Sequence, residues 1–554
     1  MGGQADTSDL WWKKAVFYCV DVETYQDSDG DGIGDFPGLT SRIDYLAELG
    51  ITCLWLMPFY PTPDRDDGYD VTDLFGVDSR LGTMADLVEL VRTAHDRGIR
   101  VIADLVVNHT SDRHPWFKAA RRSTTNRYRD YYVWRSTPPP DTSDKVVFPD
   151  QEDSIWAKDD RTGEWYLHHF YSHQPDLNFA NPAVRDEIAK SIGLWLELGL
   201  DGFRVDAVPF LVEDVETAGD DVPGDPHAYL KDLRAFLGRR RGDAVLLGEV
   251  NLPRREQLRY FGGGSGDELH MMFDFITMQA TYLSLARGDA RPLAKALRSR
   301  PATHQASQWA TFVRNHDELT LDKLTDRERA EVFAALGPEP SMQVYDRGLK
   351  RRLPPMVDGD PRRIRMVYSL LFSLPGTPTL YYGEEIGMGE DLDAPGRMAV
   401  RSPMQWSPGP TGGFSTAPPG RLIQRSTPGG YGPDHVNVRD QRRDPDSLWT
   451  FMQRLIQTYR ECPELGWGEF VELKQPDRRV LVHACTWRGS SVVAAHNLSG
   501  ERLVAEISAP ALTGQPMVLE DVYSGHHEEL TRSGVADVEL DAYGHRWWRL
   551  RPTT

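Results

Sequence analysis

The sequence predicts a parallel α/β barrel of eight strands, the (β/α)₈ fold, as the main domain of this 554-residue chain. Three observations support this prediction. Eight short apolar runs recur along the first two thirds of the chain, and helical patterns separate them. Glycine closes several of these helices just before the next apolar run. The runs are continuously apolar rather than alternating, which is typical of parallel strands buried on both faces.

The predicted elements follow this plan in order. Gly50 closes the helix between the first two strands, and Gly98 closes the helix before the third strand. Asn181 and Pro182 begin a further helix in the manner of a cap followed by proline, and that helix leads into the fourth strand. The eight predicted strands are 15–20, 51–57, 100–107, 201–208, 245–249, 271–275, 309–314 and 379–382.

Two stretches interrupt the barrel pattern, and a third follows it. Residues 109–180, rich in Trp, Tyr, Asp and Pro, are predicted to form a small domain inserted after the third strand. A charged, helical insertion, 319–361, follows the seventh strand. Short β-like runs from about residue 466 onward predict a separate all-β sandwich over 466–554. The barrel is therefore assigned to 1–108 and 181–465.

The charge balance and the apolar runs exclude several classes of partner. The formal net charge is −20, which argues against nucleic acid or an anionic membrane, because both require a basic surface. The first ten residues lack the apolar core of a signal peptide, and the longest apolar run, 366–374, is too short to span a bilayer. We therefore expect a cytoplasmic protein, and the sequence is compatible with an oligomer. The four cysteines have no metal-binding spacing and are predicted to be buried thiols; they are Cys19, Cys53, Cys462 and Cys485.

Polar residues gather at the carboxyl ends of the predicted strands, where barrel enzymes carry their catalytic groups. Three separate strands each end in or near one carboxyl group, namely Asp206, Glu249 and Asp317. His109 and His316 lie at the ends of two of the strands. A single such carboxyl is usually a capping residue, but three at equivalent strand ends favour a catalytic site.

The fourth strand carries Arg204 and Asp206 on one face, since they are two residues apart. The pair is either a structural ion pair or a nucleophilic carboxylate that the guanidinium keeps ionised. Glu249 follows an apolar strand, and such an environment raises the pKa of a carboxyl group. Paired carboxyls of this kind suit glycoside chemistry, with Asp206 as the nucleophile and Glu249 as the general acid/base.

An acidic, glycine-rich loop follows the first strand. Alternating carboxylates on a loop bent by glycine are able to direct their oxygens at a hard cation. The alternative is a solvated acidic turn. The sequence favours a structural calcium ion, with magnesium as the other candidate, and no organic cofactor. The predicted ligands are Asp27, Asp29, Asp31, Ile33 and Asp35.

These motifs together match a known family. Residues 104–109, 174–178, 202–208, Glu249 and 315–317 occur in the order found in glycoside hydrolase family 13, the α-amylase family, which the sequence resembles over nearly its whole length. The resemblance implies a double displacement that retains the α configuration. It also implies that Asp317 is the third carboxylate, which binds sugar hydroxyls and stabilises the transition state. The loop at 27–35 is similar to the calcium site of the family.

The resemblance further implies the residues that contact the glucose at the cleavage site. His109, Arg204 and His316 match the family's contacts to this sugar, and Tyr69 matches the tyrosine that stacks on it. Asp66 corresponds to the aspartate that binds a terminal hydroxyl, and Arg401 is expected to be the ion-pair partner of Asp66. This pair closes the site beyond one glucose, so the resemblance implies that the enzyme recognises a non-reducing end.

Within the family, the matching stretches are most similar to members that isomerise maltose to trehalose by intramolecular glucosyl transfer. Loops 250–253 and 393–399 differ from those members and lie where an acceptor sugar is expected. The alternative is therefore an exo-α-glucosidase or transglucosidase acting on another small α-glucoside. A non-catalytic binding protein on the same barrel is disfavoured, because all three carboxyls are present. Expected substrates are small α-glucosides such as maltose, trehalose or sucrose, and the two insertions are the expected lid that excludes water.

Overall fold

The predicted eight-stranded parallel barrel is confirmed. The computed structural model describes residues 10–211, 227–508, 517–529 and 535–552. The barrel closes with the strand order β1-β14-β10-β9-β8-β7-β3-β2, and every neighbouring pair is parallel. Its strands are β1 (Phe17–Val20), β2 (Cys53–Leu56), β3 (Arg100–Leu105), β7 (Gly202–Val205), β8 (Val245–Gly248), β9 (Met271–Phe273), β10 (Gln308–Thr311) and β14 (Thr377–Tyr381).

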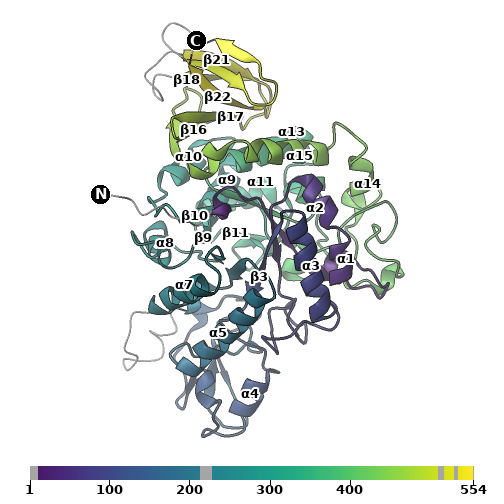
Figure 1. The fold of residues 1–554 in the computed structure, drawn as a ribbon, viewed down its shortest axis with the longest axis vertical. Helices are drawn as coiled ribbons and strands as arrows, with labels where there is room; N and C mark the ends of the chain where they lie inside the picture. Colours follow the sequence, from purple (N-terminus) through teal and green to yellow (C-terminus); the bar gives the residue numbers. More distant parts are fainter. Residues whose placement is uncertain (1–9, 212–226, 509–516, 530–534, 553–554) are drawn as a thin grey trace.

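Helices surround this barrel and cover the apolar outer face of the strands (Figure 1). Nearly every residue of the eight strands is buried, as continuous apolar runs require. In the described part of the chain, none of the helices is long and apolar enough to cross a membrane. The helices of the barrel and its loops are α1 (Phe36–Thr40), α2 (Ile43–Leu49), α3 (Met84–Asp96), α5 (Pro182–Glu197), α7 (Ala228–Arg240), α8 (Arg254–Tyr260), α9 (Phe275–Arg287), α10 (Arg291–Arg298), α13 (Pro361–Ser373), α14 (Val438–Gln441), α15 (Leu448–Arg460) and α16 (Pro463–Trp467).

The helix boundaries follow the local signals in the sequence. Gly50 ends α2 in the left-handed conformation, at φ 99°, where a residue with a Cβ atom would be strained. Asn181 caps α5 by accepting a hydrogen bond from the Ala183 N–H, and Pro182 occupies the first turn. Thr83 and Asp86 form a capping box at the start of α3, and this helix positions β3.

Both insertions lie where the pattern changes, after β3 and after β10. The first contains α4 (Pro115–Ala120) and a three-stranded antiparallel sheet of β4 (Trp134–Arg135), β6 (Trp165–Leu167) and β5 (Trp156–Lys158). The second was predicted to be helical, but α11 (Asp326–Leu336) and α12 (Leu353–Met356) make up only part of it. It also contains a small sheet of β11 (Leu319–Thr320), β13 (Gly348–Leu349) and β12 (Gln343–Val344).

This second insertion differs from its prediction for a local reason. Tyr345 and Asp346 both adopt positive φ, so the chain reverses between β12 and β13 without the Asn-Gly or Asp-Gly pair that normally announces such a turn. The strands are two residues long, and β11 comes from a distant part of the insertion. Strands this short leave no readable alternation in the sequence.

The C-terminal sheet domain is confirmed. One sheet has six strands, in the order β15-β16-β17-β22-β19-β20, and the other pairs β18 with β21. A separate apolar core that includes Val482, Ile507 and Trp548 lies between the sheets, as in a sandwich. Figure 1 shows this domain at one end of the molecule and the inserted α4 segment at the other. The strands are β15 (Glu469–Leu473), β16 (Val480–Trp487), β17 (Ser490–Asn497), β18 (Leu503–Ser508), β19 (Met517–Asp521), β20 (His527–Glu529), β21 (Val535–Leu540) and β22 (His545–Pro552).

A row of three histidines connects this domain to the barrel. His483, His496 and His545 lie on neighbouring strands with nearly parallel rings, whose centroids are 6.2 and 6.3 Å apart. His483 donates to the Ser373 carbonyl oxygen at 2.8 Å, and His496 contacts the Ser369 hydroxyl at 3.0 Å, so both reach α13. Burial, together with nearby arginine side chains, lowers the pKa of His483 and of His545 to about 4.

We expect the contact between the C-terminal domain and the barrel to weaken in acid. A histidine whose folded pKa lies below its unfolded value of 6.5 contributes stability above pH 6.5, and that stability is lost as the pH falls toward 4. For His483 the loss amounts to about 3 kcal/mol. Thermal unfolding followed from pH 7.5 to 4.5 should show a falling Tm. The variant His483→Phe should flatten this dependence, whereas His526→Phe, at an exposed position, should leave it unchanged.

Candidate active site

The predicted carboxyl groups meet at the carboxyl end of the barrel. Asp206 directly follows β7, Glu249 directly follows β8, and Asp317 lies in the loop after β10. Parallel strands in register bring their carboxyl ends to one edge of the barrel, so side chains distant in sequence become neighbours. Asp206 and Asp317 retain only small exposed fractions, and Glu249 is partly exposed.

Arg204 is the centre of this arrangement. Its side chain is buried inside the barrel, and its Nη1 atom lies 2.5 Å from Asp104 and 2.7 Å from Asp206. Its Nη2 atom contacts the carboxylate of Glu249. The two carboxyl groups therefore reach neighbouring nitrogens of one guanidinium and face the same space. A retaining mechanism requires two carboxyl groups close together, because both must act on one glycosidic bond.

The backbone next to Asp206 is held in an unusual conformation. Ala207 has φ 49°, in the left-handed region that residues other than glycine seldom adopt. This turn brings the Ala207 N–H near the carboxylate of Glu249, where it acts to lower the pKa of that group. Strain of this kind is concentrated at functional sites, where surrounding contacts maintain it. The left-handed conformation of Ala207 therefore sets the position of its N–H relative to the Glu249 side chain.

Asp317 is held as an anion by three neighbours. Its Oδ1 atom lies 2.6 Å from Arg397 and 3.1 Å from Arg401, and its Oδ2 atom lies 3.2 Å from the ring of His316. Burial alone would raise the pKa of Asp317, but His316 and the two arginines hold it far below the usual range. A permanently ionised carboxylate is suited to binding hydroxyl groups and to stabilising positive charge on a sugar ring.

The sequence predicts a raised pKa for Glu249 and an ionised Asp206. In the structure, the pKa values of both carboxyls are raised. Burial raises the pKa of Glu249 to about 7, as expected. Burial also raises the pKa of Asp206 to about 7, although Arg204 opposes this shift, because the charges of Asp104 and Asp317 add to it. Asp206 and Glu249 therefore behave as a pair that shares one proton near neutral pH.

A bell-shaped pH profile follows from this shared proton. In the roles predicted from the sequence, the reactive form has an ionised Asp206 and a protonated Glu249. Below about pH 7 the pair gains a second proton and Asp206 loses its charge; above about pH 7 the pair loses its only proton and Glu249 cannot act as an acid. We expect kcat/KM for maltose to be highest near pH 7 and to fall on both sides. A profile that rises steadily from pH 5 to pH 9 would contradict this assignment.

Two histidines and a tyrosine complete the inner surface. The Tyr69 hydroxyl lies 2.8 Å from His316 Nε2, and the two rings are stacked. His109 Nε2 lies 3.2 Å from the Tyr69 carbonyl oxygen. The Nδ1 atoms of His109 and His316 are buried, and neither has a hydrogen-bond partner in the described part of the chain. Buried polar atoms normally have partners, so these two are suited to sugar hydroxyls.

The ion pairs around Asp66 require a correction. Arg401 was expected to pair with Asp66, but its Nη1 atom contacts Asp67. Arg397 is the partner of Asp66, at 2.6 Å, and Gln174 donates to the other oxygen of Asp66 at 2.9 Å. The expectation failed because the 3₁₀ turn Gly396–Val400 brings Arg397 and Arg401 to the same edge of the site, a placement that sequence order does not reveal.

The structure thus adds three residues to the site that sequence reasoning did not include: Arg397, Asp67 and Gln174. A second arginine four residues before Arg401 was the available signal for Arg397. Arg397 and Arg401 connect Asp317 to the loop after β2 through ion pairs with Asp66 and Asp67. The two arginines and these two aspartates form a wall beside Asp317. We call these four residues the arginine wall.

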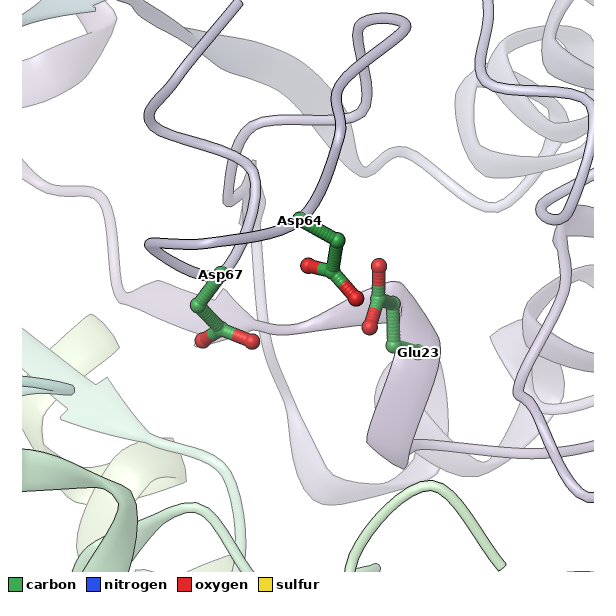
Figure 2. A group of neighbouring side chains, drawn as sticks. All are labelled: Glu23, Asp64 and Asp67. Carbon is green, nitrogen blue, oxygen red and sulfur yellow. The ribbon is translucent and has the colours of Figure 1, made fainter. Parts of the chain in front are cut away.

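A second group of carboxylates includes Asp67 of this wall. Figure 2 shows Glu23, Asp64 and Asp67 gathered together, with one ligand oxygen from each within 4.8 Å of the others. Arg80 pairs with Glu23 at 2.8 Å and with Asp64 at 2.7 Å, and Arg401 pairs with Asp67. Two arginines therefore offset only part of the negative charge of this cluster, because Arg80 also pairs with Asp78 and Arg401 with Asp317.

The predicted cation loop folds into a compact turn. Asp27, Asp29 and Asp35 place one carboxylate oxygen each within 4.8 Å of one another, which fits a hard cation. Asp31 is not a member of this group, and its carboxylate accepts from the Ile33 N–H at 2.8 Å. Asp27 also accepts hydrogen bonds from the Gly30 and Gly32 N–H groups, which would orient its oxygens. The Asp31 carboxylate therefore lies outside the predicted ligand group, and Ile33 would contribute only its backbone oxygen.

Three carboxyls at the end of a parallel barrel, two of them on one guanidinium, are the groups that an enzyme acting on glycosides needs. Comparison with known proteins identifies the family. The family of the alpha amylase catalytic domain matches residues 21–335 and 350–468, and that of the sucrose hydrolase-like C-terminal domain matches residues 489–549. The chain belongs to the α-amylase family of glycoside hydrolases and is an enzyme acting on α-glucosides.

Particular relatives are similar over most of the chain. Trehalose synthase/amylase TreS of Mycobacterium tuberculosis is 41% identical over 551 residues, which cover 98% of this chain and 90% of that protein. Trehalose synthase of Pimelobacter is 41% identical over 504 residues, covering 88% of this chain and 87% of the relative. Among solved structures, the trehalulose synthase MutB of Pseudomonas mesoacidophila matches with a TM-score of 0.76 and 26% identity, covering 98% of this chain and 99% of that one.

Proposed function

We propose that this enzyme interconverts maltose and trehalose by intramolecular glucosyl transfer. The observation that carries the proposal is the meeting of Asp206, Glu249 and Asp317 at one edge of the barrel, beside an arginine that also contacts the first insertion. Arg397 pairs with Asp66 and Asp317, and we infer that this ion pair closes the site on the side of the non-reducing sugar. The similarity to two trehalose synthases over most of the chain supports the same reaction.

The first half of the reaction transfers glucose to the enzyme. A carboxylate oxygen of Asp206 attacks the anomeric carbon of the non-reducing glucose of maltose. Glu249 gives its proton to the departing glycosidic oxygen, so the bond to the second glucose breaks and a β-glucosyl-enzyme forms. Asp317, an anion in the folded protein, stabilises the positive charge that develops on the ring.

The second half returns the glucosyl unit to the same glucose molecule. The released glucose turns until its own anomeric hydroxyl faces the intermediate, and Glu249 removes the proton of that hydroxyl. The hydroxyl oxygen then bonds to the anomeric carbon, Asp206 departs, and trehalose results with the α configuration retained. Water at this stage would give free glucose, so the balance between isomerisation and hydrolysis depends on how well water is excluded.

The two insertions contact each other above the site. Tyr345, in the turn between β12 and β13, packs on Phe148 of the first insertion with ring centroids 5.0 Å apart. The Arg347 guanidinium donates to the Val147 carbonyl oxygen at 2.7 Å and lies 3.4 Å from Glu318, the residue after Asp317. Arg397 lies beneath Phe148, 5.4 Å from its ring centre. We call the contact of Tyr345 and Arg347 with residues 147 and 148 the roof. Through Arg397 it connects both insertions to the arginine wall.

Removal of the Arg347 side chain should let water into the site. The variant Arg347→Ala loses the hydrogen bond to Val147 and the contact with Glu318, interactions worth about 1–3 kcal/mol. We expect the share of free glucose among the products of maltose to rise about fivefold or more. Arg327→Ala, at an exposed position in the same insertion, is the matched control. An unchanged product ratio in Arg347→Ala would show that this contact does not exclude water.

We propose in addition that the loop of Asp27, Asp29 and Asp35 holds a structural calcium ion, for which magnesium is the alternative. The ion would stabilise the loop after β1 by neutralising these carboxylates. A cytoplasmic location fits the cysteines, all four of which are buried and free, as predicted.

A product profile tests the main proposal. Incubation with maltose should give trehalose with little glucose, and incubation with trehalose should give maltose. Glucose as the only product would reject the proposal in favour of an exo-α-glucosidase, which the altered acceptor loops at 250–253 and 393–399 favour. Sucrose serves as the third substrate, because transfer from sucrose alone would identify a transglucosidase of different acceptor specificity.

A further inference from the structure

Arg314 is a buried arginine that belongs neither to the proposed reaction nor to the arginine wall. It lies between β10 and Asp317, and only 2% of it is exposed. Among the residues that the structure describes, no carboxylate forms an ion pair with Arg314, and its Nε atom has no hydrogen-bond partner. Charged side chains are almost never buried without a partner, because desolvation is costly. The burial of Arg314 therefore requires an explanation.

The surroundings of Arg314 do not supply a paired negative charge. Burial lowers the pKa of Arg314, and the neighbouring cation Arg352 acts in the same direction. Glu384 lies close enough to oppose this shift, but its carboxyl group accepts from the Tyr381 N–H at 2.8 Å and from the Tyr368 hydroxyl at 3.2 Å. Burial also raises the pKa of Glu384 to about 7, so this group is only partly ionised at neutral pH. An ion pair therefore does not explain why Arg314 is buried.

The hydrogen bond that Arg314 does make is directed at the catalytic turn. Its Nη2 atom donates to the Asp317 carbonyl oxygen at 2.6 Å. A charged donor forms a shorter and stronger hydrogen bond than a neutral one. The Asp317 N–H donates to Asn315 Oδ1 at 3.2 Å. The Asp317 backbone is thus held at both its N–H and its carbonyl group.

Arg401 holds the same turn in a different way. Its Nε atom donates to the His316 carbonyl oxygen at 2.8 Å, and its Nη2 atom lies 3.1 Å from the Asp317 carboxylate. Arg401 therefore contacts the side chain of Asp317, whereas Arg314 contacts the backbone. Both levels matter, because a carboxylate that stabilises developing charge must be oriented before the reaction begins.

We propose that Arg314 is a positioning residue for Asp317: its hydrogen bond fixes the peptide that follows Asp317, so that the carboxylate keeps its orientation toward the sugar ring. Without this bond the Asp317 backbone could rotate while Arg397 and Arg401 still hold the side chain, and the carboxylate oxygens would be displaced. A displacement of about 1 Å is enough to slow catalysis roughly tenfold or more. The inference rests on the role of Asp317 in the proposed function.

A double-mutant cycle between Arg314 and Asp317 tests the inference. The assay is fluoride release from α-glucosyl fluoride, which does not depend on the acceptor. Arg314→Met should lower kcat about tenfold or more and change KM less than about threefold, because the ground state binds without a fully placed Asp317. Asp317→Asn should lower kcat about a hundredfold or more.

The decisive comparison is the effect of Arg314→Met in the Asp317→Asn background. It should lower kcat less than about twofold there, because the carboxylate that Arg314 positions is already gone. The same loss in both backgrounds would overturn the proposal, and so would an unchanged kcat in Arg314→Met alone. Arg314→Lys keeps a charged donor, so its loss should be smaller and should also disappear in the Asp317→Asn background. The lysine variant keeps the test decisive if Arg314→Met does not fold.

Stability measurements separate positioning from a purely structural role. The Tm of Arg314→Met should change by only about 2 °C, because removal of a buried charge offsets the lost hydrogen bond. Arg300→Met is the matched control, since Arg300 is also buried but forms an ion pair with Asp274 at 2.6 Å. This control should lower the Tm and leave the kcat of the folded enzyme within about twofold. The same pattern in Arg314→Met would assign Arg314 a structural role and refute the inference.

The cycle also distinguishes this inference from the proposed function. An unchanged kcat in Asp317→Asn would remove Asp317 from the proposed mechanism and the inference with it. A loss in Asp317→Asn without coupling to Arg314 would reject the role of Arg314 alone. Because fluoride release does not report which sugar is formed, a failure of maltose–trehalose interconversion would leave the role of Arg314 to be judged separately.

Discussion

Asp206→Asn should abolish turnover of maltose, with kcat falling roughly 10⁴-fold or more, as is typical when a covalent nucleophile is lost. The amide cannot form the glucosyl ester, and no other carboxyl is placed to replace it. Glu249 contacts the opposite nitrogen of Arg204, and Asp317 is engaged by two arginines. Steady-state assays of trehalose and glucose formation from maltose measure this loss.

The substitution should cost little stability. Asparagine is nearly isosteric with aspartate and still accepts a hydrogen bond from Arg204, which remains paired with Asp104. The Tm should therefore change little, so that inactivity cannot be attributed to unfolding. Asp160→Asn, on an exposed loop of the first insertion, is the matched control and should be fully active. Activity of Asp206→Asn within tenfold of the unmodified enzyme would remove Asp206 from the nucleophile's role.

Glu249→Gln should lower kcat for maltose by about 10²- to 10⁴-fold, the usual contribution of a general acid/base. The loss should depend on the leaving group. α-Glucosyl fluoride needs no proton to release fluoride, so Glu249→Gln should still form the glucosyl-enzyme from it at a rate within about tenfold of the unmodified enzyme. Asp206→Asn should fail with both substrates, because it lacks the attacking group.

Fluoride release in single-turnover experiments distinguishes these cases. A burst of fluoride from Glu249→Gln followed by slow turnover would show that the first step survives and that activation of the acceptor fails. Glu256→Gln, on α8 near the surface, is the control. Equal losses of Glu249→Gln with maltose and with the fluoride would contradict the role of Glu249 as the acid.

The barrel and the placement of three carboxyls at its carboxyl end were predictable, because their signals are local. Each strand is a continuous apolar run, and burial on both faces requires this composition wherever the strand lies. Asp206, Glu249 and Asp317 follow such runs directly or within a few residues, and the direction of parallel strands brings their ends to one side of the barrel. Helix caps such as Asn181 were predictable for the same local reason.

The electrostatics of the site was predictable only in part. An apolar strand before Glu249 correctly indicated a raised pKa. Arg204 beside Asp206 suggested an ionised nucleophile, yet burial and the charges of Asp104 and Asp317 outweigh it. These opposing charges come from other strands, so their distance from Asp206 is not encoded in its neighbours along the chain.

By itself the sequence determined the strands, the helices that separate them and the carboxyls at the strand ends, because short-range patterning and burial leave few alternatives for such segments. Only the tertiary structure decided that Arg397 rather than Arg401 pairs with Asp66, and that Tyr345 and Arg347 meet the first insertion. Each of these contacts joins loops hundreds of residues apart, whose relative positions are set by closure of the barrel and not by any local preference.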